Sequence, residues 1–259
     1  MKLSFSIPAH NEEILLYKCL DSVENEIKEE TQNCNLNGVD IEIVVVNNNS
    51  IDNTKYVALS YFEKFKKLNV NLKVIDENKK GLLFARQAGF INSDGDIVAN
   101  IDSDAYLTKG WLVKVINEFE KDKTLVALSG PQIYCDLSSY EKLLAKIFYF
   151  PGYLFHIISL KLFNKGKMLQ GGNFIIKREV WEKAGGFDTS IEFYGEDTDV
   201  VKRIASYGKV IWTWNLPIYA SGRRIKKEGI LKTGFHYFVN FIWVSFFGIP
   251  KTKNHKDHR

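Results

Sequence analysis

Two carboxylates one residue apart, in the segment Ile101-Asp102-Ser103-Asp104, are the residues of this chain best suited to chemistry. They follow the apolar run from Asp96 to Asn100, which is typical of a buried strand, so we expect both acids where that strand ends. Side chains at i and i+2 of an extended segment point the same way, and adjacent carboxylates repel each other unless a cation lies between them. A hard divalent cation, Mg²⁺ or Mn²⁺, that itself holds a diphosphate would satisfy this arrangement. A solvated turn is the alternative, because Asp and Ser are common in turns.

A second group of acids lies in the segment Glu196-Asp197-Thr198-Asp199. The residues that follow it form an apolar helix face, so these acids are expected in the first turn of a helix. Acidic residues favour that position in any case, because they interact well with the helix dipole. The local sequence therefore leaves two roles open, capping and catalysis.

The elements that would position these acids repeat a pattern of strand, polar loop and helix. The predicted strands are Leu3–Ile7, Ile41–Val46, Leu72–Ile75 and Asp96–Asn100. A helix can start on Asn11, and another is expected between Gly81 and Gly89. The pattern predicts an α/β fold with a Rossmann-like, mostly parallel sheet, in which ligands gather beyond the carboxyl ends of the strands.

Several segments together resemble the family 2 glycosyltransferases, which have the GT-A nucleotide-sugar fold. The resembling segments are Pro8-Ala9-His10-Asn11-Glu12, Asn47 to Thr54, Gly81 to Gly89, Asp102-Ser103-Asp104, Gly171-Gly172-Asn173, Gly185 to Asp188, and Gly195 to Asp199 followed by Arg203. No single segment is specific to this family, but the occurrence of all of them in this order is. The resemblance runs from residue 3 to about residue 210.

The resemblance implies a donor site for a nucleoside-diphosphate sugar. Its residues would be Pro8, Ala9, Asn11, Glu12, Asn47, Asn48, Asn49, Arg86, Asp102 and Ser103, with the metal, Mn²⁺ or Mg²⁺, on Asp102 and Asp104. UDP is the expected nucleotide. Asn48 stands where most family members have an Asp, and because an amide can donate as well as accept, dTDP and GDP stay open. Arg86 would lie near the base or the diphosphate, and a surface helix arginine is its alternative.

The resemblance also implies an acceptor side, with Asp197 as general base and with Gly171, Gly172, Asn173 and Glu196 around the sugar and acceptor. The implied reaction is an inverting transfer of a sugar to a hydroxyl acceptor, in the assembly of a bacterial-type cell-surface glycan or glycolipid. Two alternatives remain. One is a sugar-phosphate nucleotidyltransferase, although the Pro8 to Glu13 turn lacks the glycine-rich basic loop of that class. The other is a non-catalytic scaffold that binds nucleotide sugars.

Charge and composition divide the chain unevenly. Residues 1–222 would form the glycosyltransferase domain, with a nucleotide-binding half (1–110) and an acceptor half (111–222), and residues 223–259 a basic, aromatic extension. The extension has a net charge of about +7, whereas the whole chain has +4, so residues 1–222 have a negative net charge. Its aromatic run, Phe235 to Gly248, is shorter than the roughly 20 residues of a spanning helix.

A similar aromatic run with basic flanks extends from Ile147 to Phe163. Both runs suit contact with an anionic membrane surface, and packing on the core or on a second copy is the alternative. Nucleic acid is not an expected partner, because no binding motif accompanies the charge. Three widely spaced cysteines and a start that reads as a strand suggest a cytoplasmic protein, peripheral on the inner membrane where it touches one. The sequence does not identify the transferred sugar, the acceptor or the oligomeric state.

Overall fold

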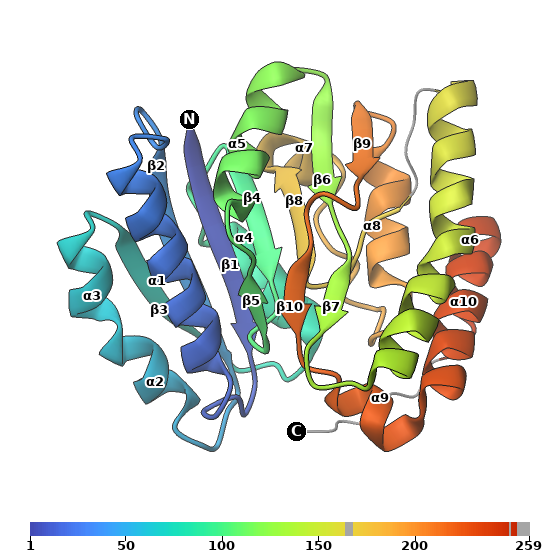
Figure 1. Ribbon diagram of the computed structural model, residues 1–259, viewed down its shortest axis with the longest axis horizontal. Coiled ribbons are helices and arrows are strands. Elements are labelled where there is room, and N and C mark those ends of the chain that lie inside the picture. Colours follow the sequence, from blue (N-terminus) through green and yellow to red (C-terminus); the bar gives the residue numbers. More distant parts are fainter. Residues whose placement is uncertain (164–167, 249, 253–259) are drawn as a thin grey trace.

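The computed structural model describes residues 1–163, 168–248 and 250–252, and its central feature is a seven-stranded sheet with helices on both faces (Figure 1). The strand order is β3-β2-β1-β4-β8-β6-β9. Only β8 runs against its neighbours, β4 and β6, so the sheet is mostly parallel, as predicted. The strands are β1 Lys2–Ala9, β2 Asp40–Asn48, β3 Asn71–Glu77, β4 Ile97–Ile101, β6 Leu125–Ser129, β8 Asn173–Lys177 and β9 Lys209–Trp212.

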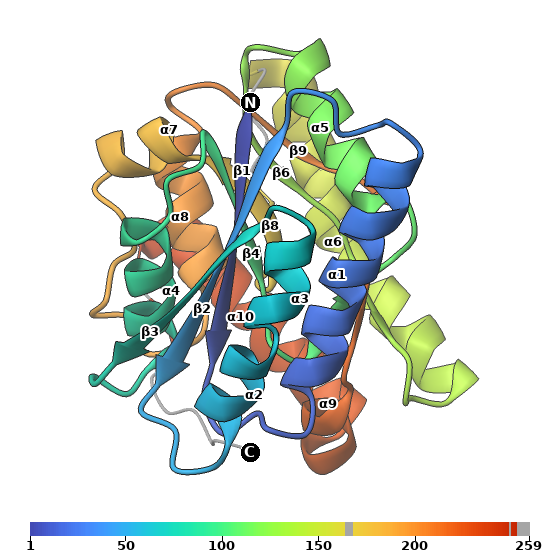
Figure 2. The ribbon, with the colours of Figure 1, turned by 90° about the vertical axis from the view of Figure 1, so that its left-hand side faces the viewer.

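Helices cover the two faces of this sheet in separate groups (Figure 2). One face carries α1 Leu16–Gln32, α2 Thr54–Ser60, α3 Phe62–Lys67 and α5 Trp111–Lys121. The other face carries α4 Leu82–Ile91, α7 Arg178–Lys183 and α8 Glu196–Ile204. Apolar side chains of the strands are buried against both groups, which is why the central strands read as continuous apolar runs.

The four predicted strands are confirmed, as is the helix after Gly81. The helix expected to start on Asn11 is wrong by five residues, because α1 begins at Leu16. Asn11 instead has the left-handed backbone conformation, with φ +50°, and its side-chain oxygen accepts a hydrogen bond from the Ile51 amide at 3.0 Å. The residue that looked like a helix cap therefore ties the first loop to the second.

The chain turns at Asp102, so Asp104 is not two residues further along a strand. The amide of Ala105 donates to the Asp102 carbonyl at 2.9 Å, which closes a turn at the start of the short strand β5 Ala105–Leu107. The prediction that Asp102 and Asp104 lie on an extended backbone is therefore wrong. The turn nevertheless leaves both acids facing one pocket.

A second, three-stranded sheet lies beside this turn. It has the order β5-β10-β7, and its strands are β5 Ala105–Leu107, β7 Gln132–Tyr134 and β10 Ile218–Ala220. Strand β10 leads into α9 Arg223–Glu228. Residues late in the chain are thereby brought back to the turn that carries Asp102 and Asp104.

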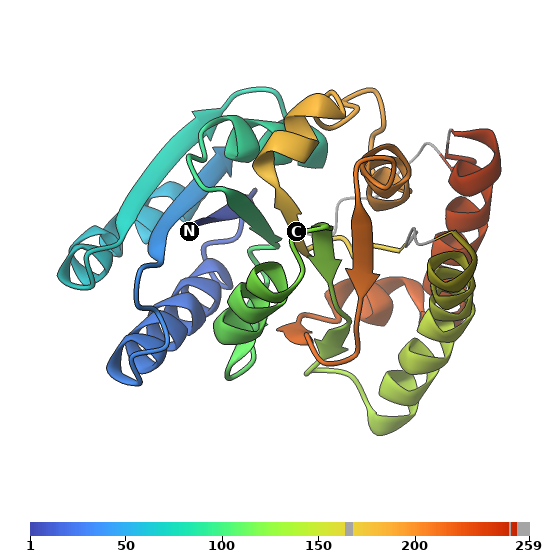
Figure 3. The ribbon, with the colours of Figure 1, turned by 90° about the horizontal axis from the view of Figure 1, so that it is seen from above.

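Two long helices, α6 Ser139–Phe163 and α10 Ile230–Phe247, stand together at the end of the molecule away from α2 and α3 (Figures 1 and 3). The predicted helical, aromatic C-terminal segment is confirmed by α10. By length and composition alone, Ser139–Leu162 is apolar enough to cross a membrane, the only such helix in the described part of the chain. Residues 249 and 253–259 of the predicted extension lie outside the described residues.

Candidate active site

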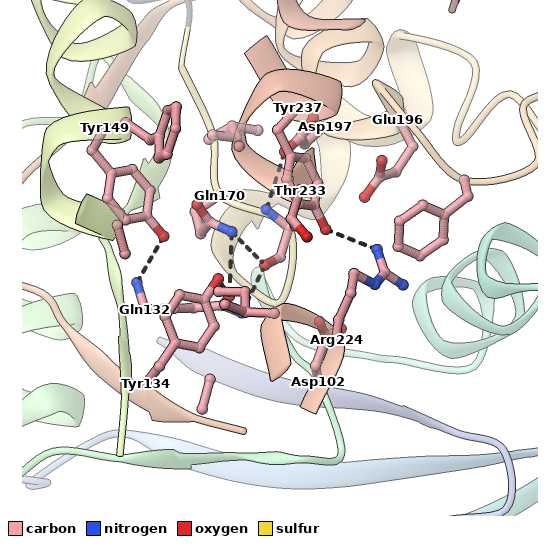
Figure 4. A pocket seen from close by; sticks show the side chains of 18 of the residues that line it. Asp102, Gln132, Tyr134, Tyr149, Gln170, Glu196, Asp197, Arg224, Thr233 and Tyr237 are labelled. Carbon is pink, nitrogen blue, oxygen red and sulfur yellow. Dashed lines mark hydrogen bonds between the residues drawn. The ribbon is translucent and has the colours of Figure 1, made fainter. Parts of the chain in front are cut away.

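A pocket of about 280 Å³ opens where the carboxyl end of the sheet meets α6, α8, α9 and α10. Its lining includes Pro8 near the end of β1, the turn from Asp102 to Asp104, Gly171, and both acids at the start of α8. Residues predicted from four separate segments therefore meet at one place. Figure 4 shows Asp102, Glu196 and Asp197 around the pocket, together with side chains of α6, α9 and α10.

Arg86 of α4 connects two of these acidic segments, the turn after β4 and the start of α8. Its guanidinium donates to Glu196 Oε1 at 2.8 Å and to Asp102 Oδ1 at 3.1 Å, and only 1% of its side chain is exposed. A guanidinium suits this position because its fork reaches two carboxylates at once. The surface-arginine alternative is wrong. Arg86 lies in the pocket lining, as an arginine that holds acids of β4 and α8 together.

A second arginine, Arg223 at the start of α9, lies between two more carboxylates. It pairs with Glu12 at 3.0 Å and with Asp104 at 3.0 Å. Glu12 is buried, so the guanidinium compensates a charge that would otherwise be costly to desolvate. The sequence did not identify Arg223, which stands 211 positions from Glu12 and belonged to the predicted extension.

Asp197 is oriented by backbone groups. Its Oδ2 accepts a hydrogen bond from the Gly171 amide at 3.2 Å, and its Oδ1 accepts one from the Thr198 amide at 2.7 Å. Burial raises the pKa of Asp197, against these hydrogen bonds and the charge of Arg86, which favour the ionised form. Burial and repulsion from Asp197 raise the pKa of Glu196 to about 7. The two neighbouring acids thus hold a proton more readily than ordinary carboxyl groups do.

Glycines let the chain pass close to these acids. A Cβ on Gly172 would lie 2.1 Å from Asp102 Oδ2, and φ at this residue is +78°. A Cβ on Gly171 would lie 3.0 Å from Glu196 Oε1. Only glycine fits the first position, because it needs both the left-handed conformation and the missing side chain.

Asn173, predicted on the acceptor side, points away from the pocket. Its side chain is fully buried, accepts from the Trp111 indole at 3.2 Å, and donates to the carbonyls of Gly130 and Leu216. Every polar group of the amide is thus used inside the protein. The structure places Asn173 under the site, where it joins β8 to the small sheet.

The predicted base-binding loops lie next to each other but outside the pocket lining, apart from Pro8. Ala9 is buried, Asn47 donates to Asp76 at 2.9 Å, and Asn49 has the left-handed conformation. His10 Nδ1 lies 2.7 Å from the Asn48 carbonyl oxygen, which joins the two loops. These contacts give the loops a fixed shape at the carboxyl edge of β1 and β2.

Both ends of the Asn48 amide are already engaged. The nitrogen donates to the carbonyls of Glu77 and Lys79 at 3.1 and 2.7 Å, and the oxygen accepts from the Gly81 amide at 2.9 Å. The side chain is 3% exposed. In this conformation Asn48 shapes the loop before α4, and the choice between uracil and guanine cannot rest on its free hydrogen-bonding groups.

Asp102 and Asp104 suit a hard divalent cation by the chemistry of their oxygens. Their side chains are 29% and 20% exposed, and both line the pocket. No group of three or more His, Cys, Asp or Glu side chains in the described chain is arranged to hold a metal by itself. Two carboxylates with the remaining ligands from phosphate and water is a common arrangement for Mg²⁺. The donor set fits, and a cation there would share Asp104 with Arg223.

The sequence also missed a set of polar residues in the lining of the same pocket. They come from β7, the loop before β8, α6, α9 and α10, and they are Gln132, Tyr134, Tyr149, Gln170, Arg224, Thr233 and Tyr237 (Figure 4). Gln132 donates to the Gly171 carbonyl at 3.1 Å, and Arg224 donates to the Tyr237 hydroxyl at 2.9 Å. The signals in the sequence were the basic, aromatic content after residue 222 and the aromatic run from Ile147 to Phe163, which indicate a surface or packing role rather than a pocket.

The chain is similar to known glycosyltransferases in sequence and in structure. A probable glycosyltransferase, YdaM, from Bacillus subtilis (strain 168) is 24% identical over 96% of this chain, which spans 64% of that protein. The mannosyltransferase PcManGT from Pyrobaculum calidifontis, solved with GDP-Man and Mn²⁺, matches 85% of the chain with a TM-score of 0.63 at 20% identity, over 56% of its own length. S. aureus TarS 1-349, solved with UDP-GlcNAc, matches 95% of the chain with a TM-score of 0.61 at 18% identity, over 73% of its own.

These structural likenesses are distant and establish the fold, which is the predicted GT-A type. The family is established by sequence. The family model described as Glycosyl transferase family 2 matches residues 4–185, which is more than half of the chain. The chain belongs to glycosyl transferase family 2.

Proposed function

We propose that this protein transfers a sugar from a nucleoside-diphosphate sugar to a hydroxyl acceptor, with inversion at the anomeric carbon. The observation that carries the proposal is that Asp197 and the pair Asp102 and Asp104 line one pocket. A carboxylate suited to proton removal thus lies in the same space as carboxylates suited to a diphosphate-bound metal. Activation of the acceptor hydroxyl and stabilisation of the leaving diphosphate would therefore both have residues in this pocket.

On the donor side, the loops after β1 and β2 would bind the nucleoside, and Asp102 and Asp104 would hold Mn²⁺ or Mg²⁺. Bound there, the metal supplies positive charge against the diphosphate. UDP is the expected nucleotide from family resemblance, with dTDP and GDP as the alternatives. The neighbours solved with GDP-Man and with UDP-GlcNAc support both sugar-nucleotide classes equally.

On the acceptor side, Asp197 would take the hydroxyl proton as the acceptor oxygen forms its bond to the anomeric carbon. The bond between that carbon and the diphosphate oxygen breaks, and the nucleoside diphosphate leaves with the electron pair. Single displacement of this kind inverts the anomeric centre. Glu196, paired with Arg86 at 2.8 Å, would hold the start of α8 in place.

The direct test is Asp197→Asn, which keeps the shape of the side chain and removes its basicity. Sugar transfer should fall about 10²-fold or more, because a positioned base contributes at least that much, while nucleotide binding stays within about twofold. Asp199→Asn is the matched control: the same change on the same helix, at a residue paired with Arg203 and absent from the pocket lining. Near-normal transfer in Asp197→Asn would remove that residue from the role.

We also assign the reaction to the assembly of a cell-surface glycan or glycolipid on the cytoplasmic side of the inner membrane. Family membership supports the first part of this assignment. The exposed apolar faces of α6 and α10 support contact with a membrane.

A further inference from the structure

The pocket does not end at the acids but continues into the space between α6 and α10. Its far part is lined by apolar or small residues, namely Ala145, Phe148 and Gly152 of α6, Met168, Leu169, and Gly234, Phe238 and Phe241 of α10. The two helices approach closely at one point, where a Cβ on Gly234 would lie 2.5 Å from the Phe148 ring. One continuous pocket therefore has a charged end and an apolar end.

Hydroxyl and amide groups lie between these ends. The Tyr149 hydroxyl accepts a hydrogen bond from the backbone amide of Gln132 at 3.3 Å. The side-chain amide of Gln170 donates to the Gly171 carbonyl at 3.3 Å, next to Asp197. The Thr233 hydroxyl is buried and has no hydrogen-bond partner in the described part of the chain, although Thr233 lines the pocket. A buried polar group without a partner costs free energy, so a ligand hydroxyl at this position would be favoured. The middle of the pocket suits a polar head.

The outer face of α6 is apolar along its whole length. Exposed large side chains recur every three or four residues, which places them on one side of the helix, at Leu143, Ile147, Phe150, Leu154, Ile158 and Leu162. Helix α10 carries a second such row at Leu231, Phe235, Phe238 and Ile242. The two helices that carry these rows lie together at one end of the molecule (Figure 3). Apolar surfaces of this extent mark an interaction site.

The charges on these helices favour a lipid surface over a second copy of the chain. Together α6 and α10 carry Lys142, Lys146, Lys161 and Lys232 against one acid, Glu141. Two copies that met through this face would bring lysines together, which is unfavourable, whereas anionic headgroups would neutralise them. Apolar side chains flanked by lysines are typical of helices that lie in the interface of a membrane.

We propose that the acceptor is a lipid-borne molecule: its polar head binds beside Asp197, and its hydrocarbon chain runs between α6 and α10 into a bilayer on which both helices rest. This inference rests on the proposed function and names its acceptor class. The apolar end of the pocket holds the chain, and the outer rows hold the protein at the surface where such acceptors are found. A water-soluble acceptor would leave both features without a use.

The inner part of the proposal is tested with octyl β-D-glucoside below its critical micelle concentration and methyl β-D-glucoside, which share a head and differ in the chain. Calorimetry should show binding about tenfold or more tighter for the octyl compound, because burying each methylene is favourable. Gly152→Leu should abolish the difference. A Cβ at residue 152 meets the Met168 side chain at an ordinary 3.5 Å, and both residues line the apolar end of the pocket, so we expect the larger side chain to narrow that end.

The outer part is tested by sedimentation with vesicles of phosphatidylglycerol and phosphatidylethanolamine. The double variant Phe150→Ser, Leu154→Ser should bind about tenfold more weakly than the parent protein. Phe62→Ser is the matched control, because Phe62 is a 47% exposed aromatic on α3 at the other end of the molecule, and its loss should change nothing. Gly152→Leu should bind vesicles normally.

Three results would overturn the inference: equal binding of the two glucosides, vesicle binding insensitive to the double variant, or a dimer in solution that the double variant dissociates without any vesicle binding. Titration of the same preparations with nucleotides and Mn²⁺ separates this failure from failure of the proposed function. Nucleotide binding without chain-dependent glucoside binding refutes the lipid acceptor alone. Chain-dependent binding without any nucleotide binding refutes the glycosyltransferase proposal.

Discussion

Two neighbouring acids at the start of α8 share one buried environment, and their proton affinities follow from it. Burial raises the pKa of both Glu196 and Asp197, while Arg86 and backbone amides favour their ionised forms. A general base must be ionised to accept a proton. The rate of sugar transfer is therefore expected to fall as the pH drops through the raised pKa of Asp197.

Glu196→Gln tests this coupling. Removing the negative charge next to Asp197 makes ionisation of Asp197 easier, so its pKa falls. The acid limb of the pH–rate profile should move to lower pH by about one unit, measured as kcat at saturating Mn²⁺. A limb that stays in place or moves to higher pH would show that Glu196 does not influence the base.

Gly172→Ala tests the close approach of the backbone to Asp102. The new Cβ would lie 2.1 Å from Asp102 Oδ2, so the carboxylate must move. Metal-dependent nucleotide binding should weaken about tenfold or more. Gly185→Ala is a matched control, since φ there is +84° and nothing lies within 4 Å of the added atom. Both variants should lose about 1–2 kcal/mol of unfolding free energy to the left-handed conformation, but only the first should lose binding. Equal binding by the two would contradict the assignment of Asp102.

Among the elements, α4 is joined to the ends of β4 and α8 by a single side chain, Arg86. Its 1% exposed guanidinium contacts acids 16 and 110 positions away. Arg86→Leu should lower the free energy of unfolding by about 3 kcal/mol, because it leaves the buried carboxylate of Glu196 without its charged partner. Arg178→Leu is the control, since Arg178 is 30% exposed and pairs with Glu182 on the surface, so its loss should cost at most about 0.5 kcal/mol. Denaturant unfolding that shows equal losses would contradict the structural role of Arg86.

The strands and the helices after them could be predicted, because their apolar periodicity is a local property of the sequence. The segment from Asp96 to Ile101 is one example, and the acids at its end were placed correctly at the edge of the sheet. Arg223 could not be predicted, because its contact with Glu12 depends on how β10 returns beside β5. Nor could the position of Asn173, since a polar residue after two glycines reads as a turn, and only the packed structure shows its three buried partners.

At the scale of the whole molecule, residues from both ends of the described chain line one pocket. Residues from Pro8 to Phe241 line it, so the predicted division at residue 222 does not divide the pocket. The basic, aromatic segment that the sequence set apart as an extension supplies Arg223, Thr233 and Tyr237 to that pocket. The proposed active site thus draws on residues from β1 to α10.

The most direct test of a donor site is calorimetric titration of the purified protein with UDP, dTDP and GDP, with and without Mn²⁺. One nucleotide should bind, and its affinity should depend on the metal. In Asp104→Asn this metal-dependent binding should weaken about tenfold or more, because a metal ligand is lost. Failure of all three nucleotides to bind, with the protein folded and Mn²⁺ present, would contradict the proposal that this pocket is a glycosyltransferase active site.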